Sequence, residues 1–483
     1  MTNRMLLALL GATLALGGCD RQNQGPLQVS AIGGEATLVN PNIQPLDAVS
    51  STLLLSTAQG LVRFDAAGQI EPGLAQSWIV SDDGLRYTFR LRRTSWNGGD
   101  RVTAAQVVER LRAASSRTSR NPLTPLLGAI DEMVAMTDDV LEISLVTPRP
   151  NFLQLLAQPE MAILRDGNGT GPYRAAPAGG GAISLYLPDA DEGGEEDVGT
   201  RDVLLRGERT QFAVARFMAE EADLVTGGDI GGLPIARAAE PGRTALRFDP
   251  APGLFGFSFA GEAAATRDPA VRRALSMAVD REELVQAIGA AGLIARDTLV
   301  SPGVTELAQP ALPNWSGQPI VQRRTGAAVA IRTATGGNPL RLTAGVPDTP
   351  GHRLVFAHLR RDWRAIGVIV ERVSPDDPKA DLRFVDRVAA IDLATWYLRQ
   401  FSCDQSRICN LSVDAILGNA RLASSAEQRQ ALLAEADRLL TADTVFIPLA
   451  NPVRWSLVSP RLTGFAPNPF GHHNVGELIA PRQ

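Results

Sequence analysis

The chain has 483 residues, of which 45% are hydrophobic and 20% charged, and these proportions exclude a disordered, collagen-like or coiled-coil protein. At roughly 150 residues per domain, this length predicts about three domains or one architecture built from several lobes. The formal net charge is −5, so the surface as a whole is not basic and we expect no nucleic-acid partner.

The first residues have the pattern of a bacterial lipoprotein signal. The apolar run at 5–16 is too short to be a stable membrane anchor, and it ends in two glycines followed by Cys19. This tail resembles a lipobox, so we expect 1–18 to be removed, Cys19 to carry the lipid and 19–26 to form a tether. Asp20 resembles the signal that retains lipoproteins at the inner membrane, which predicts a periplasmic, membrane-anchored protein. An ordinary signal peptide is the alternative.

Hydrophobic periodicity predicts alternating strands and helices through the first half of the chain. The predicted strands are 27–32, 87–92, 140–146, 183–187 and 253–259. The predicted helices are 53–61, a helix that follows Thr103 as its N-cap, and 210–219. The acidic loop 189–197 lacks the ligand spacing of an EF-hand, so we expect it to be solvated.

Helix starts are marked most clearly in the second half. Asp268 followed by Pro269 predicts an N-cap with proline at the first helical position, and Asp280 opens a second helix with a capping-box-like sequence. Two further amphipathic helices each lead into an apolar strand, which is the repeating unit of an α/β lobe. These helices are 352–366 and 425–440, and their strands are 368–370 and 445–449.

Cys403 and Cys409 remain once Cys19 is assigned to the lipid. An even number of cysteines in an oxidising compartment predicts a disulfide between them. A metal or redox pair is the alternative, but five intervening residues are not a usual metal spacing and no histidine lies nearby. We expect no metal and no cofactor.

The motifs of several enzyme classes are missing. Lys379 is the only lysine and lies in a polar stretch, which excludes a Walker A loop and Ser-x-x-Lys catalysis. The sequence also lacks Gly-x-Ser-x-Gly and His-Glu-x-x-His, so a secreted hydrolase is only an alternative. We expect His352 at the surface where its helix starts, His358 at the surface or in packing, and the adjacent His472 and His473 in solvent.

Three ordered blocks resemble the peptide/nickel class of extracellular solute-binding proteins, which are receptors of ATP-binding cassette importers. The blocks are 74–108, 169–173 (Gly-Thr-Gly-Pro-Tyr) and 267–281. The resemblance covers nearly the whole mature chain and implies an α/β fold, a two-lobed clamp with an extra α/β subdomain inserted in the first lobe. It implies a non-catalytic, monomeric receptor that delivers a solute to an inner-membrane permease. A signalling or chaperone-like clamp without a transporter is a further alternative.

The resemblance also implies a division of the chain. The first lobe takes 27–56, 167–249 and 446–483, the inserted subdomain takes 57–166, and the second lobe takes 250–445.

The same resemblance implies where the ligand binds. Peptide-binding members carry Trp-x-x-Asp-Tyr, whose aspartate holds a peptide's ammonium group; here Trp396 is followed by Arg399 at the acid's position, unless Asp404 takes that role. Because a guanidinium binds carboxylate or phosphate, we expect a peptide-like or anionic small solute with Trp396 as an apolar wall. An Arg399 salt-bridged on the surface is the alternative. The expected ligand-binding residues are Asn40, Asn42, Thr226, Gly227, Trp396, Arg399, Asp404 and Arg407.

Overall fold

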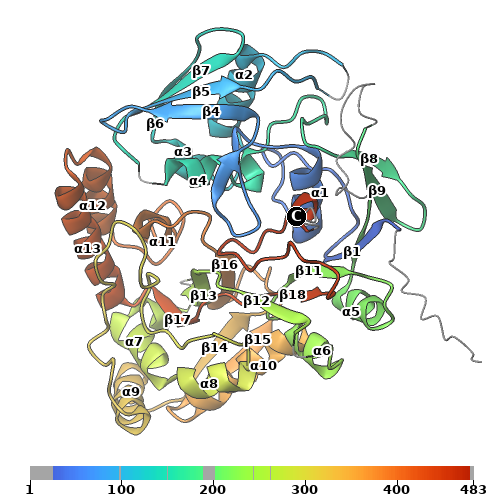
Figure 1. The fold of residues 1–483 in the computed structure, drawn as a ribbon. Coiled ribbons are helices and arrows are strands. Elements are labelled where there is room, and N and C mark those ends of the chain that lie inside the picture. Colours follow the sequence, from blue (N-terminus) through green and yellow to red (C-terminus); the bar gives the residue numbers. More distant parts are fainter. Residues whose placement is uncertain are drawn as a thin grey trace, which may run out of the picture.

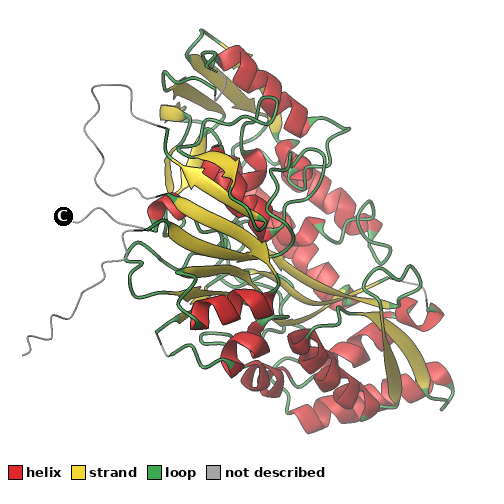
Figure 2. Cartoon of the chain, turned by 90° about the vertical axis from the view of Figure 1, so that its right-hand side faces the viewer, coloured by secondary structure: helices red, strands yellow, loops and turns green. Residues whose placement is uncertain are grey.

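The structure is a computed structural model that describes residues 25–96, 99–149, 151–188, 202–242, 244–260 and 263–478. Its strands form sheets of seven, five, four and two strands. Figure 2 shows them as a band across the molecule with helices on both sides. The predicted signal peptide, Cys19 and the acidic loop 189–197 lie outside the described residues.

The seven-stranded sheet has the order β12-β18-β11-β1-β10-β9-β8. Its strands are β1 (Leu27–Ile32), β8 (Arg174–Pro177), β9 (Ala182–Tyr186), β10 (Val203–Glu208), β11 (Leu224–Gly228), β12 (Leu246–Asp249) and β18 (Arg454–Val458). The central β1 runs parallel to both β10 and β11. Three helices belong to this part of the chain, namely α1 (Ala48–Thr57), α5 (Thr210–Met218) and α6 (Leu233–Ala238).

Helix α1 differs at both ends from the predicted helix 53–61, which was therefore wrong. It begins earlier because Asp47 caps it, with its Oδ1 accepting from the backbone N–H of Ser50 at 2.7 Å. It ends earlier because the chain must pass close to other backbone at Gly60, where an added Cβ would lie 2.5 Å from the carbonyl oxygen of Leu156.

The five-stranded sheet has the order β15-β14-β16-β13-β17. Its strands are β13 (Gly253–Phe259), β14 (Leu340–Gly345), β15 (Val368–Val373), β16 (Leu382–Val388) and β17 (Phe446–Ala450). The predicted division placed 446–450 in the first lobe, but β17 pairs with β13 in this sheet, with Phe257 opposite Ile447. All five residues of β17 are buried, so its packing fixes it to the second lobe.

The helices of the second lobe begin largely where capping residues predicted them. They are α7 (Pro269–Ala278), α8 (Arg281–Ile288), α9 (Ile320–Thr335), α10 (Pro350–Arg364), α11 (Ala394–Arg399), α12 (Leu411–Leu422) and α13 (Ala426–Asp443). The predicted N-caps are confirmed, since Asp268 accepts from Ala270 N and Asp280 from Glu283 N. His352 was wrongly predicted at the surface; it is 6% exposed and bonds Thr349 Oγ1.

The inserted segment forms a four-stranded sheet, β4-β5-β7-β6, which Figure 1 shows with α2 at the opposite end of the molecule from α7 to α10. Its strands are β4 (Ala75–Val80), β5 (Arg86–Leu91), β6 (Ile130–Ala135) and β7 (Val140–Leu145), with β2 (Val62–Phe64) and β3 (Ile70–Pro72) paired separately. Its helices are α2 (Ala104–Ser115), α3 (Thr124–Leu127) and α4 (Phe152–Leu156), and the short 3₁₀ turns of the chain are η1 (Pro159–Met161), η2 (Ala264–Arg267) and η3 (Val475–Glu477). The predicted N-cap Thr103 is confirmed, and it forms a capping box with Gln106.

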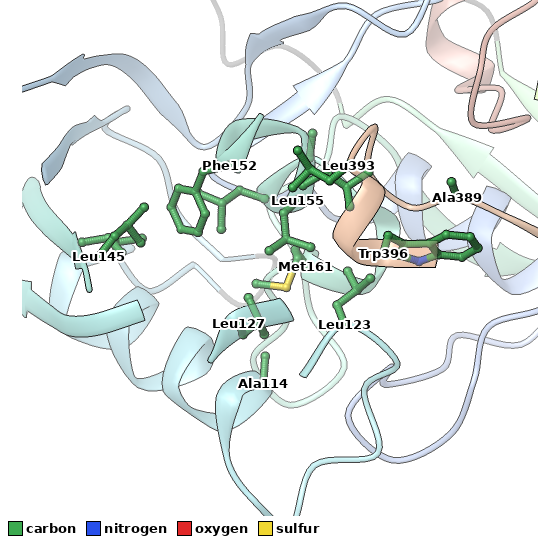
Figure 3. Packing of buried hydrophobic residues seen from close by; sticks show 14 of the residues in the cluster. Ala114, Leu123, Leu127, Leu145, Phe152, Leu155, Met161, Ala389, Leu393 and Trp396 are labelled. Carbon is green, nitrogen blue, oxygen red and sulfur yellow. The ribbon is translucent and has the colours of Figure 1, made fainter. Parts of the chain in front are cut away.

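The insert packs its core against the second lobe. Figure 3 shows Leu155 of the insert beside Leu393 of the second lobe, and Phe152 and Trp396 belong to the same cluster of buried residues. Asn151 Nδ2 also donates to the carbonyl oxygen of Asp392 at 3.2 Å. The insert and the second lobe therefore share one continuous hydrophobic core.

Candidate functional site

A cavity of about 540 Å³ lies where the first lobe, the insert and the second lobe meet. Its wall includes the start of α1, the ends of β11 and β16, the η1 turn, α11 and the segment 470–473. A cavity of this size falls within the range of small-molecule sites. We call it the interlobe cavity.

The first-lobe wall depends on a close approach between β11 and α1. Thr226 and Gly227 line the interlobe cavity together with Ala48 at the start of α1. Gly227 has a φ of 78°, and an added Cβ would lie 2.5 Å from the Cβ of Ala48. Only glycine avoids both the backbone strain and the steric clash at this position.

Glu160 brings to the interlobe cavity a carboxylate of which one oxygen has no hydrogen-bond partner among the described residues. Its Oε2 is shielded from solvent and has no hydrogen-bond partner among the described residues. Burial raises the pKa of this carboxyl, because the charged form loses hydration. The backbone is fixed by Asn121, whose Nδ2 donates to the carbonyl oxygen of Glu160 at 2.8 Å. An ammonium group of a ligand would satisfy the shielded oxygen.

Two arginines on other elements also line the interlobe cavity. Arg454 is neutralised by Asp386, with Nη1 and Oδ1 2.9 Å apart. The exposed Arg387 donates to Gln400 Oε1 at 3.0 Å and makes no ion pair within the described parts of the chain. Arg387 is therefore the guanidinium with free capacity for a ligand carboxylate.

The histidine pair lines the same cavity, with His473 buried and His472 half-buried, so the prediction of a solvated pair was wrong. His473 is 6% exposed, and its Nε2 lies 3.2 Å from Asp249 Oδ2. Burial, together with the charges of the neighbouring His473 and Arg454, lowers the pKa of His472 to about 4. The segment folds inward because Asn468 Nδ2 donates to the carbonyl oxygen of His472 at 2.8 Å. His472 is neutral at neutral pH.

Helix α11 has two faces that lead to different pockets. Trp396 and Gln400 line the interlobe cavity, whereas Thr395 and Arg399 line a separate pocket behind the helix. Each pair is four residues apart, close to the 3.6 residues of one turn, so each pair shares one face. Arg399 thus does not stand beside Trp396 in the interlobe cavity.

Neither of the two predicted asparagines lines the interlobe cavity. Asn40 Oδ1 accepts from the backbone N–H of Asn42 at 3.0 Å. Asn42 Oδ1 accepts from Asn121 Nδ2 at 3.0 Å, and Asn121 is the residue that holds Glu160. Asn42 therefore supports the wall through a second residue.

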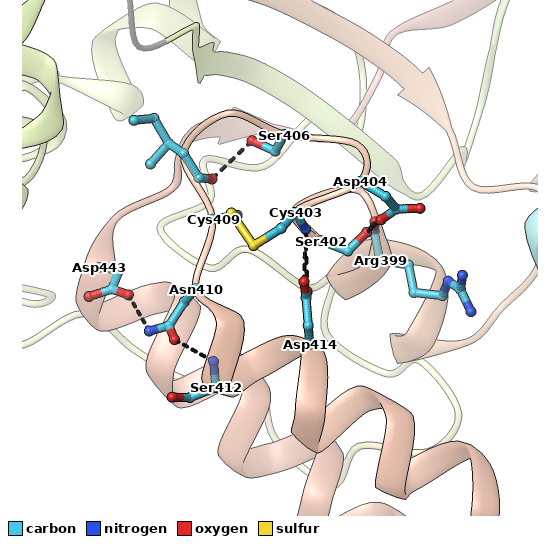
Figure 4. The surroundings of a disulfide bond; sticks show 11 residues. Arg399, Ser402, Cys403, Asp404, Ser406, Cys409, Asn410, Ser412, Asp414 and Asp443 are labelled. Carbon is cyan, nitrogen blue, oxygen red and sulfur yellow. Dashed lines mark hydrogen bonds between the residues drawn. A yellow bond between two sulfur atoms is a disulfide. The ribbon is translucent and has the colours of Figure 1, made fainter.

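Asp404 and Arg407 lie on a loop that the Cys403–Cys409 disulfide closes, with Cα atoms 5.1 Å apart (Figure 4). Asp404 accepts a hydrogen bond from the hydroxyl of Ser402, which lowers the pKa of its carboxyl. Arg407 lines another pocket beside the disulfide. Of the eight predicted ligand residues, the structure brings together Thr226, Gly227 and Trp396 in the interlobe cavity.

Sequence reasoning missed the charged groups of the interlobe cavity. Glu160 and Arg387 stand in no motif, and the distance between them along the chain hides their common location. The adjacent His472 and His473 were the only feature of the local sequence that could have pointed to this cavity. The described residues contain no group of three or more His, Cys, Asp or Glu side chains that could hold a metal ion. Nor does the described part of the chain hold a helix long and apolar enough to cross a membrane.

The family described as "Bacterial extracellular solute-binding proteins, family 5 Middle" matches residues 69–186 and 208–401, which together make up more than half of the chain. A probable deoxycholate-binding periplasmic protein of Escherichia coli K12 is 24% identical, over 86% of each chain. The periplasmic oligopeptide-binding protein OppA of Haemophilus influenzae is 22% identical, also over 86% of each chain.

The fold is similar to that of solved binding proteins. The crystal structure of Haemophilus influenzae OppA in complex with the peptide RPPGFSPFR superposes with a TM-score of 0.81 and 19% identity, covering 95% of this chain and 99% of that chain. This likeness confirms the predicted two-lobed α/β fold.

Proposed function

Because the chain belongs to family 5 of the bacterial extracellular solute-binding proteins, we propose that it is the receptor of an ATP-binding cassette importer that takes up a peptide-like solute. The prediction of a binding protein that catalyses no reaction is confirmed by the family, which favours it over the hydrolase alternative. The receptor role rests on the interlobe cavity, where two lobes and the insert enclose space for a ligand.

The charges of the interlobe cavity support a ligand that carries both an ammonium and a carboxylate group. The ammonium would pair with the shielded Oε2 of Glu160, and the carboxylate with Arg387. Trp396 offers an apolar wall for a side chain of the ligand. Deoxycholate, which the Escherichia coli relative is named for binding, has no ammonium and would leave Glu160 unpaired, so Glu160 favours a peptide.

The location and partner follow from the same proposal. The named relatives are periplasmic, and the lipobox-like sequence before Cys19 supports anchoring of this chain to the inner membrane. There, as a monomer, it would meet an inner-membrane permease. Loss of solute uptake on deletion of the gene would support this role, whereas unchanged uptake of the bound solute would favour the signalling or chaperone-like alternative.

Binding experiments test the ligand class. The protein is purified without denaturation, its released small molecules are identified by mass spectrometry, and short peptides are titrated by calorimetry. We expect peptides with a free amino terminus to bind at least tenfold more tightly than the same peptides N-acetylated, because acetylation removes the charge that pairs with Glu160. Equal affinities, or co-purification of an acid without an amine, would contradict the proposal.

A further inference from the structure

A second pocket lies back to back with the interlobe cavity, behind α11. Its walls come from the insert, around α3 and α4, and from the second lobe, around α11, α12 and α13. The two pockets have no lining residue in common. This pocket is therefore distinct from the proposed solute site.

Four arginines line this second pocket, which we call the arginine pocket: Arg149 of the insert and Arg399, Arg421 and Arg429 of the second lobe. Within the described part of the chain, Arg429 is the one of these four that forms an ion pair with a carboxylate, since its Nε lies 2.6 Å from Oε1 of the buried Glu306. Glu306 is occupied further by the hydroxyl of Thr395 at 2.8 Å. Glu306 therefore balances the charge of Arg429 alone.

The other three arginines form no ion pair with a carboxylate among the described residues, although Arg399 lies close enough to Asp404 for its charge to help lower the pKa of that carboxyl. The Nε of Arg149 is buried and has no hydrogen-bond acceptor. Burial lowers the pKa of Arg149 to about 10, and the charges of Arg429, Arg421 and Arg399 act in the same direction. Figure 4 shows Arg399 directed away from the disulfide loop. Like charges therefore gather around the shielded Nε of Arg149, and no carboxylate of the described residues forms an ion pair with Arg149.

We propose that the arginine pocket is a second binding site, specific for a small oxyanion such as phosphate or the carboxylate of an organic acid. The oxyanion would accept from the unpaired Nε of Arg149 and bridge it to Arg399, with Arg421 at the exposed rim. Arginine side chains present planar pairs of donors that match oxyanions. Because Arg149 and Arg399 come from different subdomains, a bound oxyanion would tie the insert to the second lobe.

The size of the arginine pocket fits this ligand. Its volume is about 50 Å³, whereas about 10–15 Å³ on the same measure holds one water molecule, so there is room for a small ion but not for a peptide. Apolar side chains, including Phe152 and Leu393, form most of the remaining wall. They exclude water from the site and strengthen the attraction between the guanidinium groups and an anion.

The test titrates the full chain by calorimetry with inorganic phosphate and, separately, with butyrate, at constant ionic strength. We expect saturable binding of at least one probe to a single site. Arg149→Gln and Arg421→Gln should each weaken it about tenfold, in the range of one charge-assisted hydrogen bond. Arg421 is exposed, so its replacement leaves the fold intact, and Arg341→Gln on an exposed part of β14 is the matched control that should keep wild-type affinity.

Binding of phosphate alone would identify an inorganic oxyanion, whereas tighter binding of butyrate would show that the apolar wall accepts an organic acid. No saturable binding of either probe, or equal affinities in the wild type and both pocket variants, would overturn the proposal. Peptide titrations on the same proteins report the interlobe cavity separately, so failure of one site does not imply failure of the other.

Discussion

Glu160 has a carboxylate oxygen that burial has separated from water without supplying a hydrogen-bond donor. A buried carboxylate oxygen without a donor costs free energy in the empty cavity. A cationic ligand would remove that cost, so the cavity should favour ligands that carry a positive charge. When Glu160 is protonated, it carries no charge and cannot form an ion pair with an ammonium group. Peptide affinity should therefore fall as the pH drops through the raised pKa of Glu160.

For Glu160→Gln we expect a loss of at least tenfold in affinity for peptides with a free amino terminus, and little change for N-acetylated peptides. The loss of affinity at acidic pH should also become smaller in this variant. Calorimetric titration across pH measures both effects. Glu282→Gln, at an exposed position of α8, is the matched control. A wild-type affinity in Glu160→Gln would remove this residue from the proposed site.

Asp437 makes a separate prediction about stability. It is 1% exposed on α13, and burial raises the pKa of its carboxyl to about 6 from its ordinary value of 3.8. The unfolded chain therefore releases this proton at lower pH than the folded chain does, so the stabilising contribution is complete below about pH 4 and is lost as the pH rises through about 6.

Relative to Asp437→Asn, the wild type should lose about 3 kcal/mol of unfolding free energy between about pH 4 and pH 7, since one unit of pKa corresponds to about 1.4 kcal/mol. Urea denaturation of both proteins at several pH values measures this difference. A constant offset between the two proteins across that range would show that Asp437 titrates normally.

At the scale of elements, the two faces of α11 line different pockets, so neighbouring residues of this helix belong to different sites. One turn of this helix directs Trp396 and Gln400 to the interlobe cavity and Thr395 and Arg399 to the arginine pocket. The prediction of an anionic ligand rested on Trp396, Arg399 and Arg407 lying in one ligand-recognition segment, and the structure places these three residues at three different pockets. Charge selection in the interlobe cavity is therefore proposed for Glu160 and Arg387 instead.

The loop after α11 gives a prediction for the disulfide. In a Cys19→Ser background, which leaves only Cys403 and Cys409, oxidised and denatured protein should show no free thiol. Replacing both with serine should lower the unfolding free energy by about 2 kcal/mol, because the crosslink closes only a short loop. Titration with a thiol reagent and urea denaturation measure the two outcomes. Two reactive thiols in the oxidised protein would disprove the bond.

At the scale of the whole molecule, the insert shares a hydrophobic core with the second lobe, although in sequence it interrupts the first lobe. The interlobe cavity therefore has one wall from the first lobe, with Thr226 and Gly227, and another from the insert and second lobe, with Glu160 and Trp396. A ligand that contacts both walls would stabilise their approach, which is how clamp closure selects its ligand.

Anchoring is also a property of the whole molecule. Replacing Cys19 with serine should abolish labelling by radioactive palmitate and move the protein from the membrane fraction to the soluble fraction, because the thiol is the proposed site of lipid attachment. The double replacement of Cys403 and Cys409 with serine is the control and should keep the label. Unchanged labelling of Cys19→Ser would exclude lipid attachment at this residue.

Local chemistry was sufficient for much of the fold. Thr103, Asp268 and Asp280 were predicted as N-caps, and each accepts a backbone hydrogen bond where its helix begins. These signals are readable because a cap and the N–H groups that it satisfies lie within a few residues of each other. The ordered blocks along the chain likewise indicated the family, which the match over residues 69–186 and 208–401 shows.

The location of charges was decided only in three dimensions. The pairing of β17 with β13, more than a hundred residues away along the chain, also depends on the folded structure.

Glu160, Arg387 and His472 meet in one cavity from three distant segments. The sequence by itself determined the α/β class, the helix starts and the family, because these depend on neighbours along the chain. Only tertiary packing decided which polar groups are buried without a partner, because burial depends on segments that meet after folding.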